Sequence, residues 1–199
     1  MKFELGKKRY NDYPTFFKTL FEERVQKLSI DGGFTCPNRD GSKGVGGCSF
    51  CNNESFNPDY CRAVRGITEQ IDEGIRFFAR KYKGQKYLAY FQAYSNTYAP
   101  LDVLKLRYEE ALAHPMISGL VIGTRPDVVS EEVLDYLEEL ARRYYVCVEY
   151  GVESVNDTVL RQVNRGHDFA VAEQAIRATA GRGITIGAHL IFGLPGESR

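Results

Sequence analysis

The feature of this sequence that most constrains its fold is a repeated alternation of short apolar segments with amphipathic ones. The periodicity predicts five buried strands, at residues 27–30, 87–93, 119–123, 145–150 and 184–192. Segments with the spacing of amphipathic helices precede each of the last four. Strands and helices that alternate in this way predict right-handed βαβ units in an α/β protein with a parallel sheet. That sheet is either open and doubly wound or curled into a barrel, and periodicity does not choose between them.

The boundaries of the expected helices are marked by capping residues. Apolar stripes predict helices at 71–82 and 101–112. Side chains that commonly cap helix N-termini open three further helices: Ser130, Asn156 or Asp157, and Asp168. The last of these helices is expected to end at Gly181 and Gly183.

Charge and hydropathy exclude several classes of protein. Twenty-six basic residues balance twenty-six acidic ones, so no overall field attracts nucleic acid or an anionic membrane. The longest apolar stretches are far shorter than the roughly 20 residues needed to span a bilayer, and the N-terminus lacks an apolar secretory core. We therefore expect a cytoplasmic protein without a membrane segment.

Three of the five cysteines lie close together in a glycine-rich loop after the first strand. Cys36, Cys48 and Cys51 have the spacing C-x11-C-x2-C, and such clustering indicates metal ligands more than disulfides. Three thiolates can bind a 4Fe-4S cubane and leave one iron without a protein ligand. The alternative is a zinc site with three Cys and one His, although no histidine is near this loop in sequence. Cys61 and Cys147 are expected to be buried bystanders.

In either sheet architecture, functional groups collect where the strands end. Glu149 ends an otherwise apolar strand, where an unpaired carboxylate would be costly to bury. It is either a ligand contact or half of a structural ion pair. The sequence stops directly after the fifth strand, without the helix that should cover it, which suggests a piece of a longer protein.

These motifs resemble the radical S-adenosylmethionine (SAM) enzymes, in particular the branch that contains oxygen-independent coproporphyrinogen oxidase and the catalytic subunit of Elongator. Residues 27–41 (KLSIDGGFTCPNRDG) are similar to a bacterial subgroup of that branch, the YtqA/YhcC type. The cysteine spacing is longer than the family's commonest C-x3-C-x2-C but suits this subgroup. The resemblance implies a partial (βα)6 barrel, apparently truncated after strand five, with an N-terminal extension at 1–24 and the radical SAM core at 25–199.

The resemblance also implies cofactors and their contacts. A 4Fe-4S cluster would cleave SAM to a 5'-deoxyadenosyl radical. The expected SAM contacts are Phe50 beside the adenine, Ser95 and Asn96 after strand two, Glu149 in the fourth-strand motif, Arg161 or Arg165 for the carboxylate, and Ile191 and Gly193 in the fifth-strand motif. Ser95-Asn96-Thr97 departs from the Gly-Gly-Glu of many relatives. Thr124-Arg-Pro-Asp127 matches the Elongator-like branch, so that Arg125 and Asp127 line the cavity or pair with each other. The motifs identify no catalytic residue.

The resulting functional hypothesis is SAM cleavage followed by radical modification of the C5 side chain of wobble uridine in tRNA. A flavodoxin or ferredoxin is the expected electron donor. The alternatives are a radical SAM oxidase or decarboxylase of a small molecule, and a non-catalytic, zinc-stabilised binding module. Residues 1–24, which are rich in basic and aromatic side chains, form either a helix packed on the core or a nucleic-acid contact.

Overall fold

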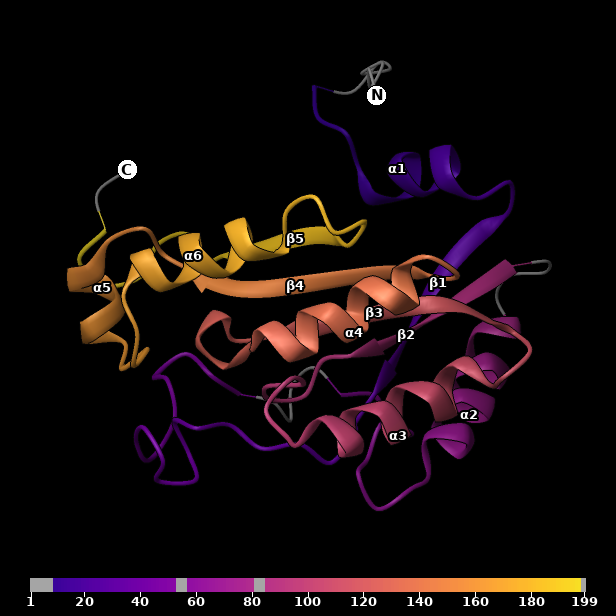
Figure 1. Ribbon diagram of the computed structural model, residues 1–199, viewed down its shortest axis with the longest axis horizontal. Coiled ribbons are helices and arrows are strands. Elements are labelled where there is room, and N and C mark those ends of the chain that lie inside the picture. Colours follow the sequence, from indigo (N-terminus) through magenta and orange to yellow (C-terminus); the bar gives the residue numbers. More distant parts are fainter. Residues whose placement is uncertain (1–8, 53–56, 81–84, 198–199) are drawn as a thin grey trace.

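The computed structural model describes residues 9–52, 57–80 and 85–197 and contains a five-stranded parallel sheet (Figure 1). The strands are β1 (Arg24–Ile30), β2 (Gln85–Phe91), β3 (Ile117–Thr124), β4 (Tyr145–Glu153) and β5 (Thr185–Leu190). Their order in the sheet is β1-β2-β3-β4-β5, so each strand lies beside its neighbours in sequence. A doubly wound sheet reverses its strand order, whereas a barrel does not. The structure therefore confirms the partial barrel.

The helices follow the predicted pattern closely. They are α2 (Ile67–Ala79), α3 (Leu101–Leu112), α4 (Glu131–Ala141), α5 (Asp157–Gln162) and α6 (Phe169–Thr179), with a short 3-10 turn, η2 (Pro126–Val128). Ser130 and Asp168 cap α4 and α6 as predicted, and Asn156 rather than Asp157 caps α5. The first predicted helix begins earlier than expected, at Ile67, and its predicted member Tyr82 lies outside the described residues.

One face of the sheet forms the main core. Alternate side chains of β2, such as Ala89 and Phe91, point toward the helices, as expected for a strand period of two. The ring of Phe91 meets that of Tyr108 on α3 edge to face, with 5.1 Å between centroids. Each such buried side chain contributes roughly 2 kcal/mol by leaving water.

The opposite, inner face is covered at one end by α1 (Tyr13–Leu20), which Figure 1 shows set apart from α2, α3 and α4. Asp12 caps this helix by accepting the N–H of Thr15. Phe17 is buried against Leu88 and Cys147 on the strands. The N-terminal segment therefore contributes a helix packed on the core, one of its two expected roles.

Three glycines let neighbouring groups approach the strands closely at the other end of the inner face. A Cβ at Gly151 would lie 2.5 Å from Glu153 Oε1, and one at Gly187 would lie 2.9 Å from Glu149 Cγ. A Cβ at Gly123 would meet the Phe91 carbonyl at 3.3 Å. The missing side chains leave room at the C-terminal ends of the strands.

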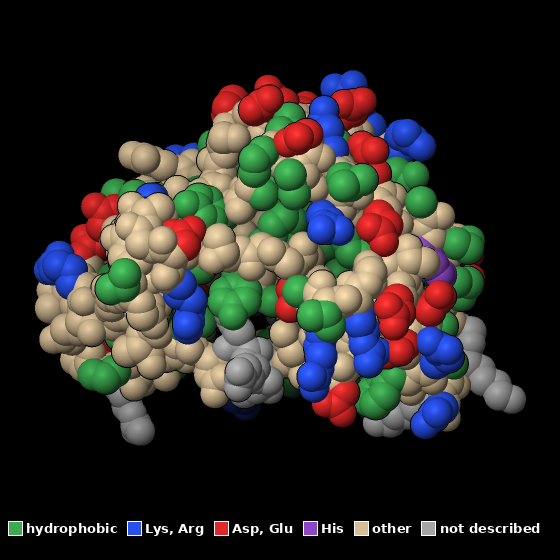
Figure 2. Space-filling view, turned by 90° about the horizontal axis from the view of Figure 1, so that it is seen from below, with side chains coloured by type: hydrophobic (Ala, Val, Ile, Leu, Met, Phe, Trp, Pro, Cys, Tyr) green, Lys and Arg blue, Asp and Glu red, His purple; other side chains and the backbone are tan. Residues whose placement is uncertain are grey.

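The surface agrees with the balanced composition. Basic and acidic side chains are interspersed on the face shown in Figure 2. None of the helices in the described ranges has the length and apolar character needed to cross a membrane.

Candidate functional site

A cavity of about 660 Å³ lies at the C-terminal ends of the strands. Its wall is made by the segments that follow β1 and β2 and by the ends of β3, β4 and β5. The cavity brings together eight of the residues predicted for the site: Cys36, Cys48, Phe50, Cys51, Ser95, Glu149, Arg165 and Ile191. Asn96, Arg161 and Gly193 lie outside its wall.

The loop that carries the cysteines is fixed by two asparagines that are far apart in sequence. Asn38 is buried, and its Nδ2 donates to the carbonyl of Asn164 and contacts Cys48 Sγ at 3.6 Å. Asn164 in turn donates to the carbonyl of Gly47 at 2.9 Å. Gly47 has φ +79°, in the left-handed region that favours glycine. These reciprocal bonds clamp the loop onto the segment after α5.

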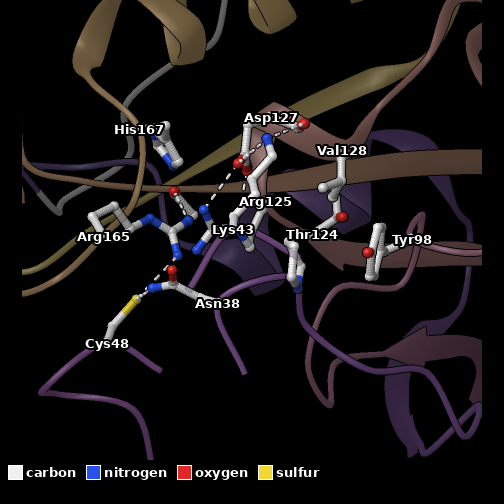
Figure 3. A network of polar contacts seen from close by, with 12 residues as sticks. Asn38, Lys43, Cys48, Tyr98, Thr124, Arg125, Asp127, Val128, Arg165 and His167 are labelled. Carbon is white, nitrogen blue, oxygen red and sulfur yellow. Dashed lines mark hydrogen bonds and ion pairs between the residues drawn. The ribbon is translucent and has the colours of Figure 1, made fainter. Parts of the chain in front are cut away.

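Two buried arginines lie beside the same loop (Figure 3). Arg165 Nη1 lies 3.7 Å from Cys48 Sγ, and Nη2 donates to the carbonyl of Gly151. Arg125 donates through Nε and Nη2 to both carboxylate oxygens of Asp127, each at 2.9 Å. Lys43 of the cysteine loop reaches the same carboxylate at 2.7 Å. Burial alone would raise the pKa of Asp127, but the bonds from Arg125 and Lys43 lower it to about 2.

The surroundings of the cysteines fit an iron–sulfur cluster. Cluster sulfurs and ligating thiolates are stabilised by N–H donors and by positive charge, and Asn38 and Arg165 supply both at Cys48. Within the described ranges, no three His, Cys, Asp or Glu side chains converge as a metal site, so the cysteines share a cavity wall rather than a closed cage. Burial raises the pKa of both Cys61 and Cys147 to about 12, which disfavours the thiolate that a metal requires.

A second polar group lies on the inner face, on strands β1, β4 and β5. Glu149 Oε1 pairs with Lys27 Nζ at 2.5 Å, and Oε2 meets His189 Nε2 at 3.1 Å. The Lys27 ammonium lies 4.4 Å from the ring centroids of both Tyr13 and Tyr90. Burial would raise the pKa of Glu149, but the bonds from His189 and Lys27 lower it to about 2. Glu149 is therefore a charged member of an ion pair and also part of the cavity wall, so both of its expected roles are compatible with the structure.

The residues after β2 take up an unusual backbone. Tyr94 has φ +63° and lines the cavity, although it is not glycine. Ser95 follows it with its Oγ buried and without a hydrogen-bond partner among the described atoms. Asn96 points away and donates to the carbonyl of Gly123 at 2.7 Å.

The remaining predicted contacts differ in whether they reach the cavity. Phe50 and Ile191 pack on an apolar cluster of Val159, Val163 and Leu194 at the edge of the cavity. Arg161 is bonded to Thr158 at an exposed position, whereas Arg165 lies in the wall. Gly193 has φ +84° beyond β5. The geometry thus favours Arg165 of the two arginines.

Sequence reasoning missed Lys27, Asn38, Tyr94 and His189 as members of the site. The signal that identified Glu149, a polar residue within an apolar strand, applies also to His189 in β5, but not to Lys27, because β1 (RVQKLSI) contains several polar residues. No comparable signal marks Asn38 or the backbone of Tyr94.

Comparison with known proteins identifies a family that the sequence matches. The model of the radical SAM superfamily matches residues 36–199. Protein YhcC of Escherichia coli (strain K12) is 43% identical over 180 residues, which cover 90% of this chain and 57% of that protein. YtqA of Bacillus subtilis (strain 168) is 38% identical over 192 residues, covering 96% of this chain and 60% of that protein. The chain therefore spans less than two thirds of the length of these relatives.

Two comparisons with archaeal sequences or structures show more distant similarity. The structure of Methanocaldococcus infernus Elp3 with an N-terminal deletion superimposes with a TM-score of 0.61 and 18% identity, over 87% of this chain and 39% of that chain. It shares the fold. The tRNA uridine(34) acetyltransferase of the same species is 30% identical over 92 residues, which are 46% of this chain and 16% of that protein.

Proposed function

Because the chain belongs to the radical SAM superfamily, whose members use a 4Fe-4S cluster and SAM, we propose that the protein is an enzyme that holds this cluster on Cys36, Cys48 and Cys51. The observation that carries the proposal is that these cysteines share one cavity with Phe50 and Arg165. When bound, the cluster supplies the electron that cleaves SAM and leaves a hydrogen-abstracting 5'-deoxyadenosyl radical.

The chain's own residues would bind and orient SAM. Arg165 keeps a buried Nε without a partner in the described structure, and the Ser95 hydroxyl is also buried and unpaired there. Unpaired buried donors are costly, so an acceptor such as the methionyl carboxylate would relieve both. Phe50 and Ile191 offer an apolar surface to the adenine. Both carboxylate oxygens of Glu149 are already bonded to Lys27 and His189, so a direct contact with SAM would have to share one of them.

The substrate that we propose is a tRNA whose wobble uridine is modified on its C5 side chain, in the cytoplasm and with electrons from a flavodoxin or ferredoxin. The support is the fold shared with Elp3 and the partial similarity to a tRNA uridine(34) acetyltransferase. An anticodon base is already largely unstacked, so it can enter a cavity at modest cost. The exposed ring of Tyr94 at the cavity wall offers it a stacking surface.

The cluster assignment is tested by iron content. Cys36→Ala, Cys48→Ala and Cys51→Ala proteins, reconstituted without oxygen, are each expected to lose nearly all iron and the visible absorbance of the cluster. Cys61→Ala is the matched control and should retain both, since Cys61 is buried away from the cavity. Full iron in Cys48→Ala protein would overturn the assignment.

The substrate is tested separately. Nucleosides from digested tRNA of cells with and without the gene are compared by mass spectrometry, and tRNA is added to the reconstituted enzyme. We expect a C5-modified uridine to decrease in the deletion strain and tRNA to stimulate 5'-deoxyadenosine release. If neither occurs while the cluster still cleaves SAM, the substrate is a small molecule and the tRNA proposal is wrong.

A further inference from the structure

His189 differs from the other two charged groups on the inner face because it reaches into the cavity. Its side chain is 52% exposed, against 6% for Glu149 and 23% for Lys27. It lies on β5 in the cavity wall, and its register partner on β4 is Gly151, which has no side chain to cover it. The SAM contacts proposed above do not use it.

Glu149 fixes the orientation of this imidazole. A carboxylate only accepts hydrogen bonds, so Nε2 of His189 must carry the proton in their 3.1 Å contact. The second oxygen of Glu149 is occupied by Lys27, which two tyrosine rings hold in place. Nδ1 of His189 has no partner in the described part of the chain and is the atom left for a ligand.

The charges around His189 favour its protonated form. Its hydrogen bond to Glu149 raises its pKa above the ordinary value, and burial, which acts in the opposite direction, is outweighed. Glu153 adds negative potential, while Lys27 opposes it.

We propose that His189, oriented by Glu149, donates a hydrogen bond to the C4 carbonyl of the substrate uracil and so positions the adjacent C5. This inference rests on the proposed function and names the recognition group within it. A protonated imidazole matches the carbonyl that uracil presents at C4. Cytosine presents an amino group there, which would place two donors against each other and leave both unsatisfied.

The test compares two anticodon stem–loop RNAs that differ only in uridine or cytidine at the wobble position. Wild-type protein should bind the uridine RNA at least about tenfold more tightly. His189→Ala should reduce this ratio to near one. His114→Ala is the control, because His114 also contacts a carboxylate, Asp72, but lies outside the cavity.

Proton NMR of the imidazole groups gives a readout that does not depend on turnover. The His189 signal, identified by its loss in His189→Gln, should titrate above the ordinary pKa, and Glu149→Gln should lower that pKa. It should shift with the uridine RNA and not with the cytidine RNA.

The possible failures are distinguishable. If tRNA is modified and binds with the same base preference in His189→Ala protein, the inference is wrong and the proposed function stands. If wild-type protein binds neither RNA, the proposed substrate and this inference are both wrong, while the cluster and SAM cleavage are judged by the iron and 5'-deoxyadenosine measurements alone.

Discussion

The two polar regions of the cavity are built in opposite ways. Around Cys48, loop segments are held by amide and guanidinium groups, and Arg165 and Arg125 each keep a buried N–H without a partner in the described structure. On the inner face, strand residues form an ion pair in which both oxygens of Glu149 are already occupied. The first region is preorganised for something that must still bind. The second is complete in itself and presents one group, His189, to a ligand.

The largest effect is expected from breaking the complete region. Glu149→Gln leaves the Lys27 ammonium between two aromatic rings without its counter-charge, and the loss of one partner of a buried pair should lower the free energy of unfolding by about 3 kcal/mol. Urea denaturation of the cluster-free protein measures it.

An exposed ion pair provides the control for this change. Glu173 pairs with Arg177 at i,i+4 on α6, with both side chains largely in solvent. Glu173→Gln should cost less than about 0.5 kcal/mol. Equal losses for the two variants would show that the Glu149 pair is no more than a surface contact.

The next prediction compares how the stability of the two regions depends on acid pH. Asp127 near the cysteines and Glu149 on the inner face both have a pKa lowered to about 2. Each contribution is fully present above the unfolded pKa, near 4, and is lost as pH falls toward 2, on the order of 2 kcal/mol each. Asp127→Asn and Glu149→Gln should each flatten part of the stability profile between pH 4 and 2.

A half-buried histidine, His167, affects the pH range above this one. Burial lowers the pKa of His167 to about 4, so it stays neutral in the folded protein and costs stability as pH falls from about 6.5 to 4. His167→Gln should therefore alter the stability profile only between about pH 6.5 and 4.

For the acid range, an Asp127→Asn profile identical to that of the wild type would argue against the Arg125–Asp127–Lys43 network.

The smallest effect should come from the clamp on the cysteine loop. Asn38→Ala removes a part-buried bond to Asn164 and a buried contact with Cys48, which should cost about 1 to 2 kcal/mol and speed loss of iron from reconstituted protein. Ser42→Ala, in the exposed part of the same loop, should stay within about 0.5 kcal/mol. Iron that is retained equally in both would mean that the loop needs no clamp.

The sequence predicts the elements that depend on local signals. Strand periodicity and caps such as Ser130 and Asp168 depend on neighbouring residues, and the structure reproduces them. The gathering of Cys36, Ser95 and Glu149 in one cavity also follows, because parallel strands end at the same edge.

Contacts across the fold were beyond such reasoning. Lys27 and Glu149 are 122 positions apart and on strands that are not neighbours, so their pairing depends on the curvature of the sheet. Asn38 and Asn164 are 126 positions apart, in loops without periodicity. The left-handed backbone of Tyr94 has no signature in a residue type that rarely adopts it.

The glycines of the inner face differ in which neighbouring group an added side chain would meet. A methyl group at Gly151 or Gly187 would collide at 2.5 or 2.9 Å with the side chain of Glu153 or Glu149, and so with the charged groups of the site. At Gly123 the nearest atom is a backbone oxygen at 3.3 Å. A side chain at Gly123 would therefore press on the backbone at the end of β2 rather than on the charged groups of the site.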